Sequence, residues 1–489
     1  MAQPIPQPRG IPVLGNVFDI TPGNTWTSLK KLAEEYGEIF QVTVLGHTVV
    51  FVASVALAEE VCDAGRFRKY VGGPIVEMRA AVHDALFTAY DDEPSWGIAH
   101  RILAPHLLFS AETTLREQSF VDMRETANEL LARWQGRGAA HVTEPLAELQ
   151  RLNLEATTLA LFGKKLGCLE GPEHPVLRAM EDATAEAILR PTRPALLNLL
   201  LYRGKFRAAI HTLRRYAEEI VRERRARPTR RRDLLAVMLE GRDPDTQARL
   251  TDEQVVDEIV SMPIGSSTAP CLLATALFLL ARHPDVLARA HQEVDAVVGS
   301  GSGPGSGTSK RDLTLHDLDN LPYMQAVVRE ALRLSFAAPG FNREPIPDET
   351  SRSGAAPPVL LAGGKYQVPR GTPIIVVMAG VNRDPSVFED PLAFKPERMM
   401  GERFASLPAG AKKWFGTGKR ACIGREYAWQ WSVLVLAMLV RRVDFELVDG
   451  HGEGEGEGEG EDEDGDELVR DGWFNYRPVG MRMKVTVRE

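Results

Sequence analysis

Apolar residues recur at three- and four-residue spacing through the middle of the chain, a pattern that predicts amphipathic helices over residues 107–134, 145–162 and 175–189. A longer periodic segment begins near Thr251, which has Gln254 at the right spacing for a capping box, and continues to about Arg282. Pro263 and Pro270 lie within this segment, and proline removes a helical hydrogen bond and bends the axis. The pattern therefore predicts a long central helix with a kink.

Strand-like runs are few and lie far apart in the sequence. The β-branched run 39–52 predicts two strands around Gly46 and His47, and similar runs return at residues 373–379 and 480–487. Because distant segments would have to supply the strands of a shared sheet, we expect one intertwined domain over residues 1–489. The predicted fold class is mainly α with small β-sheets.

Two low-complexity segments interrupt this pattern, at residues 299–309 and 450–465. Both are too rich in glycine and polar residues to bury apolar surface, so we expect flexible surface inserts. Residues 449–467 hold eleven acidic residues and no lysine or arginine, so without them the net charge of −9 becomes +2. A run of seven arginines at residues 222–233 follows a helical pattern, which favours a solvated helix end or a partner-facing surface over nucleic-acid binding.

The N-terminus and the cysteines set further limits. No uninterrupted run of about 18 apolar residues occurs and the N-terminus is proline-rich and polar, so we expect no transmembrane anchor, no secretory signal and a cytoplasmic location. Neither a disulfide framework nor a C-x-x-C metal site is formed by the four cysteines, Cys62, Cys168, Cys271 and Cys422.

The most informative stretch is KWFGTGKRACIGREYAWQW, residues 413–431, where a cysteine lies in a glycine-rich loop before a helical pattern. A thiolate at a helix N-terminus is stabilised by the helix dipole and by free backbone N–H groups. Phe415 can pack beside the sulfur, and Arg420 can reach a carboxylate. The backbone can approach a flat cofactor closely at Gly416, Gly418 and Gly424.

This stretch resembles the signature of the cytochromes P450. The pattern F-x-x-G-x-R-x-C-x-G of that family is matched at Phe415, Gly418, Arg420, Cys422 and Gly424. The resemblance implies the cytochrome P450 fold, a heme b cofactor with Cys422 as the axial iron ligand, and a long kinked helix over the heme. The alternative for Cys422 is an inert core thiol, which is also the interpretation we favour for the other three cysteines.

Two further motifs of this family occur in the expected order. Glu330 and Arg333 form an E-x-x-R pair, whose spacing puts both side chains on one helix face. Arg398, in the sequence Pro396-Glu397-Arg398, can complete a buried Glu–Arg–Arg cluster. Because breaking such a cluster leaves a buried charge without a partner, we assign the three residues to folding and heme incorporation.

The kink of the central helix carries the catalytic residues that the resemblance implies. Thr268 matches the family threonine that relays protons to dioxygen, and Ser267 stands where the family usually has an acid. Ile264 replaces a small residue and would crowd the pocket. An alcohol cannot supply a proton at neutral pH as a carboxyl does, so protons would pass through water and the hydroxyls of Ser266, Ser267 and Thr268. The alternative for Thr268 is a hydroxyl that caps a broken helix.

The N-terminal third resembles the heme domain of self-sufficient fatty-acid hydroxylases, through the runs IPQPRGIPVLGN, YGEIF, CDAGRFRKY and ALFTAY. By this resemblance the heme propionates would be held by Lys69, Trp96, His100 and Arg420, and further heme contacts would come from Phe415, Gly416 and Gly424. Phe87 would gate a substrate pocket lined by Ile75, Met78, Ile264, Ala338 and Phe474. For each pocket residue, plain core packing is the alternative.

The substrate class follows from the same resemblance. In those hydroxylases an arginine and a tyrosine in the first hairpin hold the fatty-acid carboxylate, and this chain has His47 and Phe51 at the matching positions. His47 can anchor a carboxylate only when it is protonated. We expect a fatty acid or fatty-acyl-like substrate, with a neutral or bulkier apolar molecule as the alternative.

Electrons would have to come from another protein or domain. The chain has no flavin motif and no dinucleotide-binding G-x-G-x-x-G loop in the right context, so we expect an NADPH-dependent reductase, fused or separate, that carries FAD and FMN. A basic patch for an acidic partner would be formed by Lys412, Lys413, Lys419 and Arg425. The alternative is that these charges only solvate the loop.

Together these features predict a heme-thiolate monooxygenase that uses dioxygen to hydroxylate an unactivated C–H bond of an apolar substrate. Two alternatives remain. Ser267 and Ile264 are also compatible with a heme-thiolate peroxygenase or hydroperoxide isomerase that does not depend on dioxygen. A non-enzymatic heme-binding or ligand-binding protein is the other.

Overall fold

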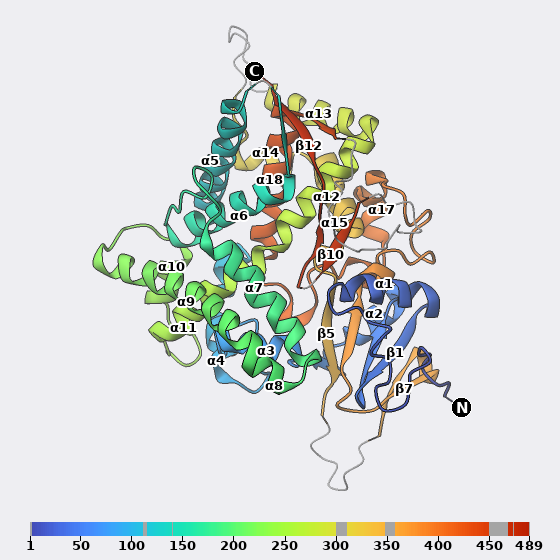
Figure 1. Cartoon of the computed structure of the whole chain (residues 1–489). Helices are drawn as coiled ribbons and strands as arrows, with labels where there is room; N and C mark the ends of the chain where they lie inside the picture. Colours follow the sequence, from blue (N-terminus) through green and yellow to red (C-terminus); the bar gives the residue numbers. More distant parts are fainter. Residues whose placement is uncertain are drawn as a thin grey trace.

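The computed structural model describes residues 2–110, 115–138, 140–299, 311–347, 357–448, 468–472 and 474–488. A large helical region makes up most of the molecule, and the N-terminal strands belong to a smaller sheet-containing region beside it (Figure 1). The predicted insert at 450–465 lies outside the described residues, as does the insert at 299–309 apart from Gly299.

Helices dominate the chain. Those of its first half are α1 (Thr25–Tyr36), α2 (Val55–Val61), α3 (Pro74–Val82), α4 (Pro94–Leu107), α5 (Leu115–Gly136), α6 (Pro145–Phe162), α7 (Pro175–Leu189), α8 (Ala195–Leu197), α9 (Arg203–Ala226) and α10 (Leu234–Glu240). Those of its second half are α11 (Asp252–Ser266), α12 (Thr268–Arg282), α13 (Pro284–Gly299), α14 (Leu315–Asp319), α15 (Pro322–Ser335), α16 (Met378–Val381), α17 (Gly401–Ser406) and α18 (Arg425–Arg442). Short 3-10 and π turns include η1 (Arg190–Thr192) and η2 (Asn198–Tyr202).

Two of the predicted helices have the expected bounds, because α6 and α7 cover residues 145–162 and 175–189. The prediction of one helix over 107–134 is wrong at its start, since α4 ends at Leu107 and α5 begins at Leu115. Phe109 adopts a positive φ of 51°, which a helix cannot accommodate. The apolar spacing runs through this break, so periodicity alone does not reveal it.

The strands form four small sheets. The largest has the order β1 (Ile39–Val44), β2 (His47–Val52), β8 (Ile374–Val377), β5 (Gly340–Pro345) and β3 (Phe67–Lys69). A three-stranded sheet has the order β4 (His141–Thr143), β12 (Met483–Val487) and β9 (Val443–Leu447). Two-stranded sheets pair β6 (Val359–Leu361) with β7 (Tyr366–Val368) and β10 (Arg470–Gly472) with β11 (Tyr476–Pro478). The strands predicted within 39–52, 373–379 and 480–487 are therefore confirmed, and distant segments share sheets.

The predicted central helix is present and is broken near its middle. Thr251 and Gln254 form the reciprocal capping box at the start of α11, and α12 ends at Arg282. Ser267 separates the two helices with φ −64° and ψ −11°. The break falls between Pro263 and Pro270, where the sequence predicts a kink.

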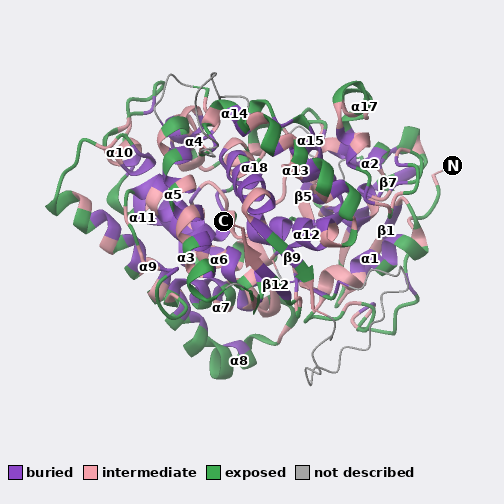
Figure 2. Cartoon of the chain, turned by 90° about the horizontal axis from the view of Figure 1, so that it is seen from above, coloured by how far each residue is buried: buried purple, intermediate pink, exposed green. Residues whose placement is uncertain are grey.

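The combined segment Asp252–Arg282 has the length and composition of a helix that could cross a membrane. In its apolar window, however, 67% of the residues are buried inside the protein, as in the core helix of a soluble fold. Figure 2 shows the same burial, with α12 and α18 largely purple.

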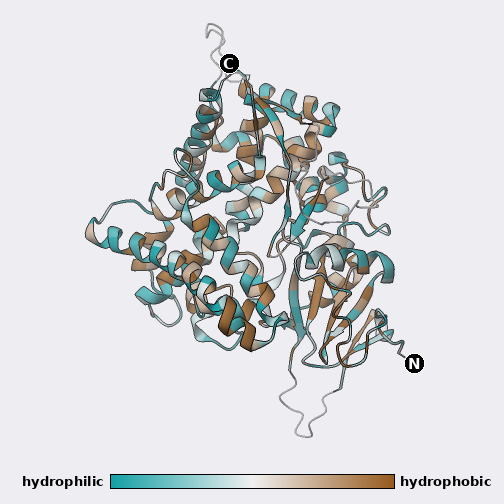
Figure 3. Ribbon diagram, in the orientation of Figure 1, coloured by the Kyte–Doolittle hydropathy of each residue, from teal (hydrophilic) through white to brown (hydrophobic). Residues whose placement is uncertain are grey.

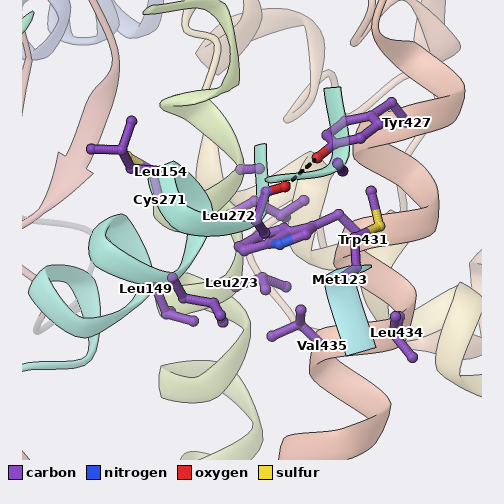
Figure 4. Packing of buried hydrophobic residues seen from close by; sticks show 14 of the residues in the cluster. Met123, Leu149, Leu154, Cys271, Leu272, Leu273, Tyr427, Trp431, Leu434 and Val435 are labelled. Carbon is purple, nitrogen blue, oxygen red and sulfur yellow. Dashed lines mark hydrogen bonds between the residues drawn. The ribbon is translucent and has the colours of Figure 1, made fainter. Parts of the chain in front are cut away.

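The main hydrophobic core forms where α12 packs against α6, α15 and α18. Figure 4 shows Trp431 of α18 among Leu272 and Leu273 of α12, with Met123 of α5 close by. The Trp431 side chain is 1% exposed. The Tyr427 hydroxyl donates a 3.5 Å hydrogen bond to the carbonyl of Ala156. This packing fixes the start of α18 against the central helix.

The arginine-rich run at the end of α9 is partly structural. Arg224 donates hydrogen bonds of 2.9 and 2.6 Å to the two carboxylate oxygens of Asp233, which is 0% exposed. Arg231 pairs with the buried Asp122 and donates to the carbonyl of Leu159. The run therefore anchors the loop after α9, in addition to ending a helix.

Candidate active site

Cys422 lies in a tight loop directly before α18. Its backbone N–H donates a 2.8 Å hydrogen bond to the carbonyl of Phe415, which closes the loop. Gly416 and Gly418 have φ values of 72° and 63°, in the left-handed region where glycine is favoured. Gly424 is the N-cap residue of α18. The glycines of the motif thus shape a loop that presents the thiol at a helix N-terminus.

The environment of the Cys422 thiol differs from that of the other cysteines. Burial raises its pKa, while a hydrogen bond from the Gly424 N–H and the charge of Arg425 lower it. Although protein surrounds this side chain, Cys422 is exposed, whereas the other three cysteines are buried. Burial raises the pKa of the Cys271 thiol to about 12, so it stays protonated. A thiol that is enclosed and still accessible fits an iron ligand better than an inert core residue.

Two cationic side chains lie in the same region and share the Leu86–Phe87 segment. The Lys69 ammonium donates to the carbonyl of Phe87 and lies 4.6 Å from the centroid of its ring. Burial and the nearby Arg420 lower the pKa of Lys69 to about 7. The Arg420 guanidinium donates to the carbonyls of Leu86 at 3.3 Å and of Ala89 at 3.0 Å. Asp91 supplies one anion here, since its Oδ1 lies 3.4 Å from Arg420 Nε, and two cations beside one carboxylate favour a further anion.

Arg420 also joins two of the predicted heme contacts. Its guanidinium lies 4.2 Å from the Trp96 ring centroid, and Trp96 stacks on His100 with ring centroids 4.8 Å apart. Burial, Arg420 and Arg101 lower the pKa of His100. The Arg420 Nε is buried, makes no hydrogen bond within the described chain and lies 3.4 Å from Asp91 Oδ1. This unsatisfied donor, and cations that outnumber the one carboxylate beside them, fit the carboxylates of a heme.

The hydroxyls at the helix break donate to separate carbonyls. Ser266 Oγ donates to Pro263, Ser267 Oγ to Ile264 at 2.6 Å, and Thr268 Oγ1 to Gly265 at 3.4 Å. Two amides hold the serines, because Asn153 donates to Ser266 and Asn475 to Ser267. In this part of the structure no hydrogen bond joins the three hydroxyls to one another. The predicted relay is therefore not a direct chain, and water would have to link its members.

The residues predicted to line the substrate pocket are only partly brought together. Ile264 and Phe474 line one pocket beside the helix break, together with the predicted catalytic residue Ser267. Phe87 meets Phe474 edge to face, with ring centroids 5.5 Å apart and an interplanar angle of 78°. Met78 is 2% exposed within the main core, which matches the core-packing alternative for that residue. Ile75 is half-buried and Ala338 is exposed.

The two hairpin residues that were predicted to contact the substrate differ in burial. His47 opens β2 and is exposed. Phe51 is 6% exposed and stacks on Phe40, with ring centroids 5.0 Å apart and an interplanar angle of 10°. It belongs to the small core between α1 and the first sheet. Phe51 thus packs as a core residue, and its contact with a substrate stays a prediction.

The structure brings Glu330, Arg333 and Arg398 together. Arg333 donates to both carboxylate oxygens of Glu330, at 2.9 and 2.7 Å, and both side chains are 0% exposed. Arg398 Nε lies 3.2 Å from Glu330 Oε1. Arg333 also donates to the carbonyls of Asn382, Pro391 and Ala393. The cluster therefore connects α15 to the segment that follows α16.

The four basic residues near the Cys422 loop already have partners. Lys419 pairs with Asp91 at 2.9 Å, and Arg425 with Glu426 at 2.8 Å. Lys412 donates to the carbonyls of residues 404 and 405, and Lys413 to the Thr417 hydroxyl. The Lys419 and Arg425 side chains are still 55% and 52% exposed, so a partner can reach them.

A buried acid near this region was missed from the sequence. Glu258 of α11 is 2% exposed, and its Oε1 accepts a 2.9 Å hydrogen bond from the Leu86 N–H. Its Oε2 is buried and makes no hydrogen bond among the described residues. Burial raises the pKa of Glu258 to about 8. Its sequence position could have indicated burial, because Glu258 lies three residues after Val255 and one before Ile259, on the apolar face of the helix.

Glu258→Gln should change how stability depends on pH. The folded-state pKa is about 8 against an ordinary 4.5, so between these values the folded protein binds more protons than the unfolded chain. Glu258 therefore makes the free energy of unfolding fall with rising pH, by up to about 1.4 kcal/mol for each pH unit. We therefore expect the free energy of unfolding, measured with urea, to fall less steeply with rising pH in Glu258→Gln than in the parent protein. The control Glu446→Gln changes a side chain that is 71% exposed and should follow the parent curve. Parallel curves for the parent protein and Glu258→Gln would contradict this account.

Comparisons with known proteins agree with this geometry. A sequence model of the cytochrome P450 family matches residues 5–455. A bifunctional cytochrome P450/NADPH–P450 reductase of Acremonium egyptiacum is 36% identical over 457 residues, covering 92% of this chain and 41% of the relative. A self-sufficient cytochrome P450 monooxygenase of Phanerodontia chrysosporium is 36% identical over 454 residues, covering 92% and 41%.

A third relative, a bifunctional cytochrome P450/NADPH–P450 reductase of Aspergillus oryzae, is 36% identical over 452 residues, covering 91% of this chain and 39% of its own length. The chain thus spans about two fifths of the length of the curated relatives it matches. This match over nearly all of its residues accounts for the cysteine loop, the Glu–Arg–Arg cluster and the broken central helix together. The chain belongs to the cytochrome P450 family, whose cofactor is heme.

Proposed function

We propose that the protein is a heme-thiolate monooxygenase that hydroxylates an unactivated C–H bond of an apolar substrate. The observation that carries the proposal is the Cys422 thiol, which is exposed inside a glycine-shaped loop at the start of α18. Bound heme would supply the iron at which dioxygen is activated. The relatives described above are named as cytochrome P450 monooxygenases or as fusions with a reductase, which supports the same reaction class.

The chain's own residues would hold the heme. Cys422 would hold the heme iron through its thiolate, and the Gly424 N–H that donates to its sulfur would reduce the basicity of the thiolate. Arg420 and Lys69 would pair with the heme carboxylates, with Trp96 and His100 packed beside them. Pairing with carboxylates would further offset the cost of these cations, which now have the single carboxylate of Asp91 beside them.

At the helix break, Thr268 would hold a proton for the reaction. Its hydroxyl is only weakly held by the Gly265 carbonyl, at 3.4 Å, so it can turn to a water molecule. Ser267 is bound more firmly, at 2.6 Å to Ile264 and 2.7 Å from Asn475. We therefore assign the mobile proton to Thr268 and a supporting role to Ser267. Ile264 and Phe474 would keep bulk water from the substrate.

The electrons would come from an NADPH-dependent reductase that carries FAD and FMN, fused or separate. The names of the relatives support this, because two of them are cytochrome P450/NADPH–P450 reductases. Lys419 and Arg425 lie beside the Cys422 loop and stay half-exposed, so they are suited to an acidic partner surface.

The proposed substrate is a fatty acid or a fatty-acyl-like molecule. The aromatic pair Phe87–Phe474 and the partly apolar pocket beside it would accept an alkyl chain. His47 is exposed at the start of β2, where it could meet a carboxylate.

Saturated fatty acids of increasing length should shift the ferric heme from low to high spin, because an alkyl chain bound in the pocket beside the helix break would exclude water from the heme site. The shift is read from the Soret band in a titration. Fatty alcohols of the same length are the control. Equal spin-state shifts with acids and alcohols would assign binding to the alkyl chain rather than to the carboxylate. If no fatty acid acts, the substrate assignment is wrong. Turnover with hydrogen peroxide but none with a reductase and dioxygen would overturn the monooxygenase assignment.

A further inference from the structure

Five successive backbone carbonyls between α3 and α4 are held by charged side chains. We call these five residues, 86–90, the Phe87 segment. Arg420 donates to the carbonyls of residues 86, 89 and 90, Lys69 to that of residue 87, and Arg79 to that of residue 88. Because a chain connection can otherwise adopt many backbone conformations, these contacts select one of them.

Glu258 of α11 holds the same segment at a backbone N–H. Its Oε1 accepts a 2.9 Å hydrogen bond from the Leu86 N–H, so Leu86 is held at both its N–H and its carbonyl. Hydrophobic and hydrophilic residues are mixed along the helices of this region (Figure 3), and Glu258 is a hydrophilic residue at a buried position, 2% exposed. Its Oε2 makes no hydrogen bond within the described ranges. A buried carboxyl with a single partner is costly, so its presence needs an explanation.

The charged groups around Glu258 do not pair with it. Burial, and then the nearby charges of Asp257 and Asp84, raise the pKa of Glu258. Asp257 itself accepts a 2.6 Å hydrogen bond from Arg214, and its Oδ2 lies 3.1 Å from His83 Nδ1. Two adjacent acids of α11 therefore hold the two ends of the turn that leads from α3 into the Phe87 segment.

The Phe87 side chain connects this turn to the proposed substrate pocket. Its ring meets that of Phe474, which lines the pocket beside the helix break. In the proposed site the heme carboxylates share Arg420 and Lys69 with the Phe87 segment. Glu258 is not shared in this way, because its hydrogen bond is made to the Phe87 segment.

We propose that Glu258 is a positioning residue, which sets the place of the Phe87 ring through its hydrogen bond to the Leu86 N–H. The ring then limits the space that an alkyl chain has beside the heme, and so decides which of its carbons is presented for oxidation. The inference rests on the proposed function, because it needs a heme beside Phe87. It gives a part of the central helix outside the break a role in specificity.

Hydrogen–deuterium exchange of the heme-loaded protein tests the contact itself. Glu258→Met removes the acceptor and keeps a side chain of similar size, so exchange in the peptide that contains residues 84–90 should become at least about tenfold faster. Glu258→Gln keeps a carbonyl oxygen for the Leu86 N–H and should stay within about threefold of the parent. The matched control Glu293→Met removes a half-buried carboxylate that accepts two backbone N–H groups of α15, both at 2.8 Å. It should leave residues 84–90 unchanged.

Two heme ligands test whether the contact positions Phe87. Imidazole needs little room beside the iron, whereas 4-phenylimidazole carries a phenyl ring that must share the pocket with Phe87. Soret titrations of the ferric protein give both dissociation constants. We expect their ratio to change at least about fivefold in Glu258→Met, because the space beside a ligand determines such discrimination. Glu258→Gln and Glu293→Met should keep the ratio of the parent protein.

Two results would overturn the inference. One is exchange in residues 84–90 that Glu258→Met does not accelerate. The other is faster exchange with an unchanged ratio of dissociation constants, which would leave Glu258 a purely structural role. Both measurements are made without turnover, so a protein that binds heme and hydroxylates nothing would contradict the proposed function and still decide this inference. Far-ultraviolet circular dichroism checks that each variant is folded.

Discussion

Cys422→Ser is expected to abolish the strongly red-shifted Soret band that the reduced protein shows under carbon monoxide. The red shift requires a thiolate on the iron, and a serine hydroxyl is neither ionised at neutral pH nor as strong a donor. Cys422 is the one cysteine of the four that is exposed, so no other thiol is available to replace it.

Cys62→Ala is the matched control for this change. The Cys62 thiol lies beside Thr417, in the same loop region as Cys422, but it is buried and burial raises its pKa. The control should keep the red-shifted band. A band that persists in Cys422→Ser, or that disappears in Cys62→Ala alone, would place the iron ligand elsewhere and remove the basis of the proposed function.

Arg333→Ala is expected to lower the free energy of unfolding by about 3–5 kcal/mol. The change leaves the Glu330 carboxylate at 0% exposure with Arg398 and the backbone N–H of Lys395 as the neighbours that remain. It also removes hydrogen bonds to the carbonyls of residues 382, 391 and 393. Urea unfolding followed by circular dichroism measures the loss, and the fraction of protein that retains heme should fall with it.

Lys484→Ala is the control for a solvent-exposed ion pair. Lys484 and Glu446 are 3.3 Å apart with side chains 50% and 71% exposed, so their separation should cost less than about 1 kcal/mol. Arg333→Lys is also informative, because one ammonium cannot reproduce the fork of donors that Arg333 presents to Glu330 and the three carbonyls. If Arg333→Ala cost no more than Lys484→Ala, the cluster would not be the structural element that its burial indicates.

Local patterns allowed much of this structure to be predicted. The bounds of α6 and α7 follow from apolar spacing within each helix, and the capping box of Thr251 from two residues three apart. The loop at Cys422 was predictable because its glycines are required at fixed positions around the thiol. In each case the residues that determine the structure are neighbours in the sequence.

Features that depend on distant partners could not be predicted. The hydroxyls of Ser266 and Ser267 are oriented by Asn153 and Asn475, which lie far away in the chain. Phe51 could equally have faced a pocket, until the stacking with Phe40 placed it in a core. Burial cannot be predicted from local sequence either: the leucine-rich run 195–202 would ordinarily be assigned to the interior, yet Leu200 and Leu201 are 68% and 65% exposed.

The sharing of sheets between distant segments has a consequence for how the chain acquires its structure. Val50 of β2 pairs with Ile374 of β8, and Thr143 of β4 pairs with Met483 of β12. During synthesis, β2 and β4 must wait for partners that leave the ribosome hundreds of residues later. Closing such long loops is entropically costly and slows folding, so the helices of the middle of the chain would assemble first. Until the late strands arrive, the edges of the N-terminal strands would stay accessible to aggregation or to chaperones.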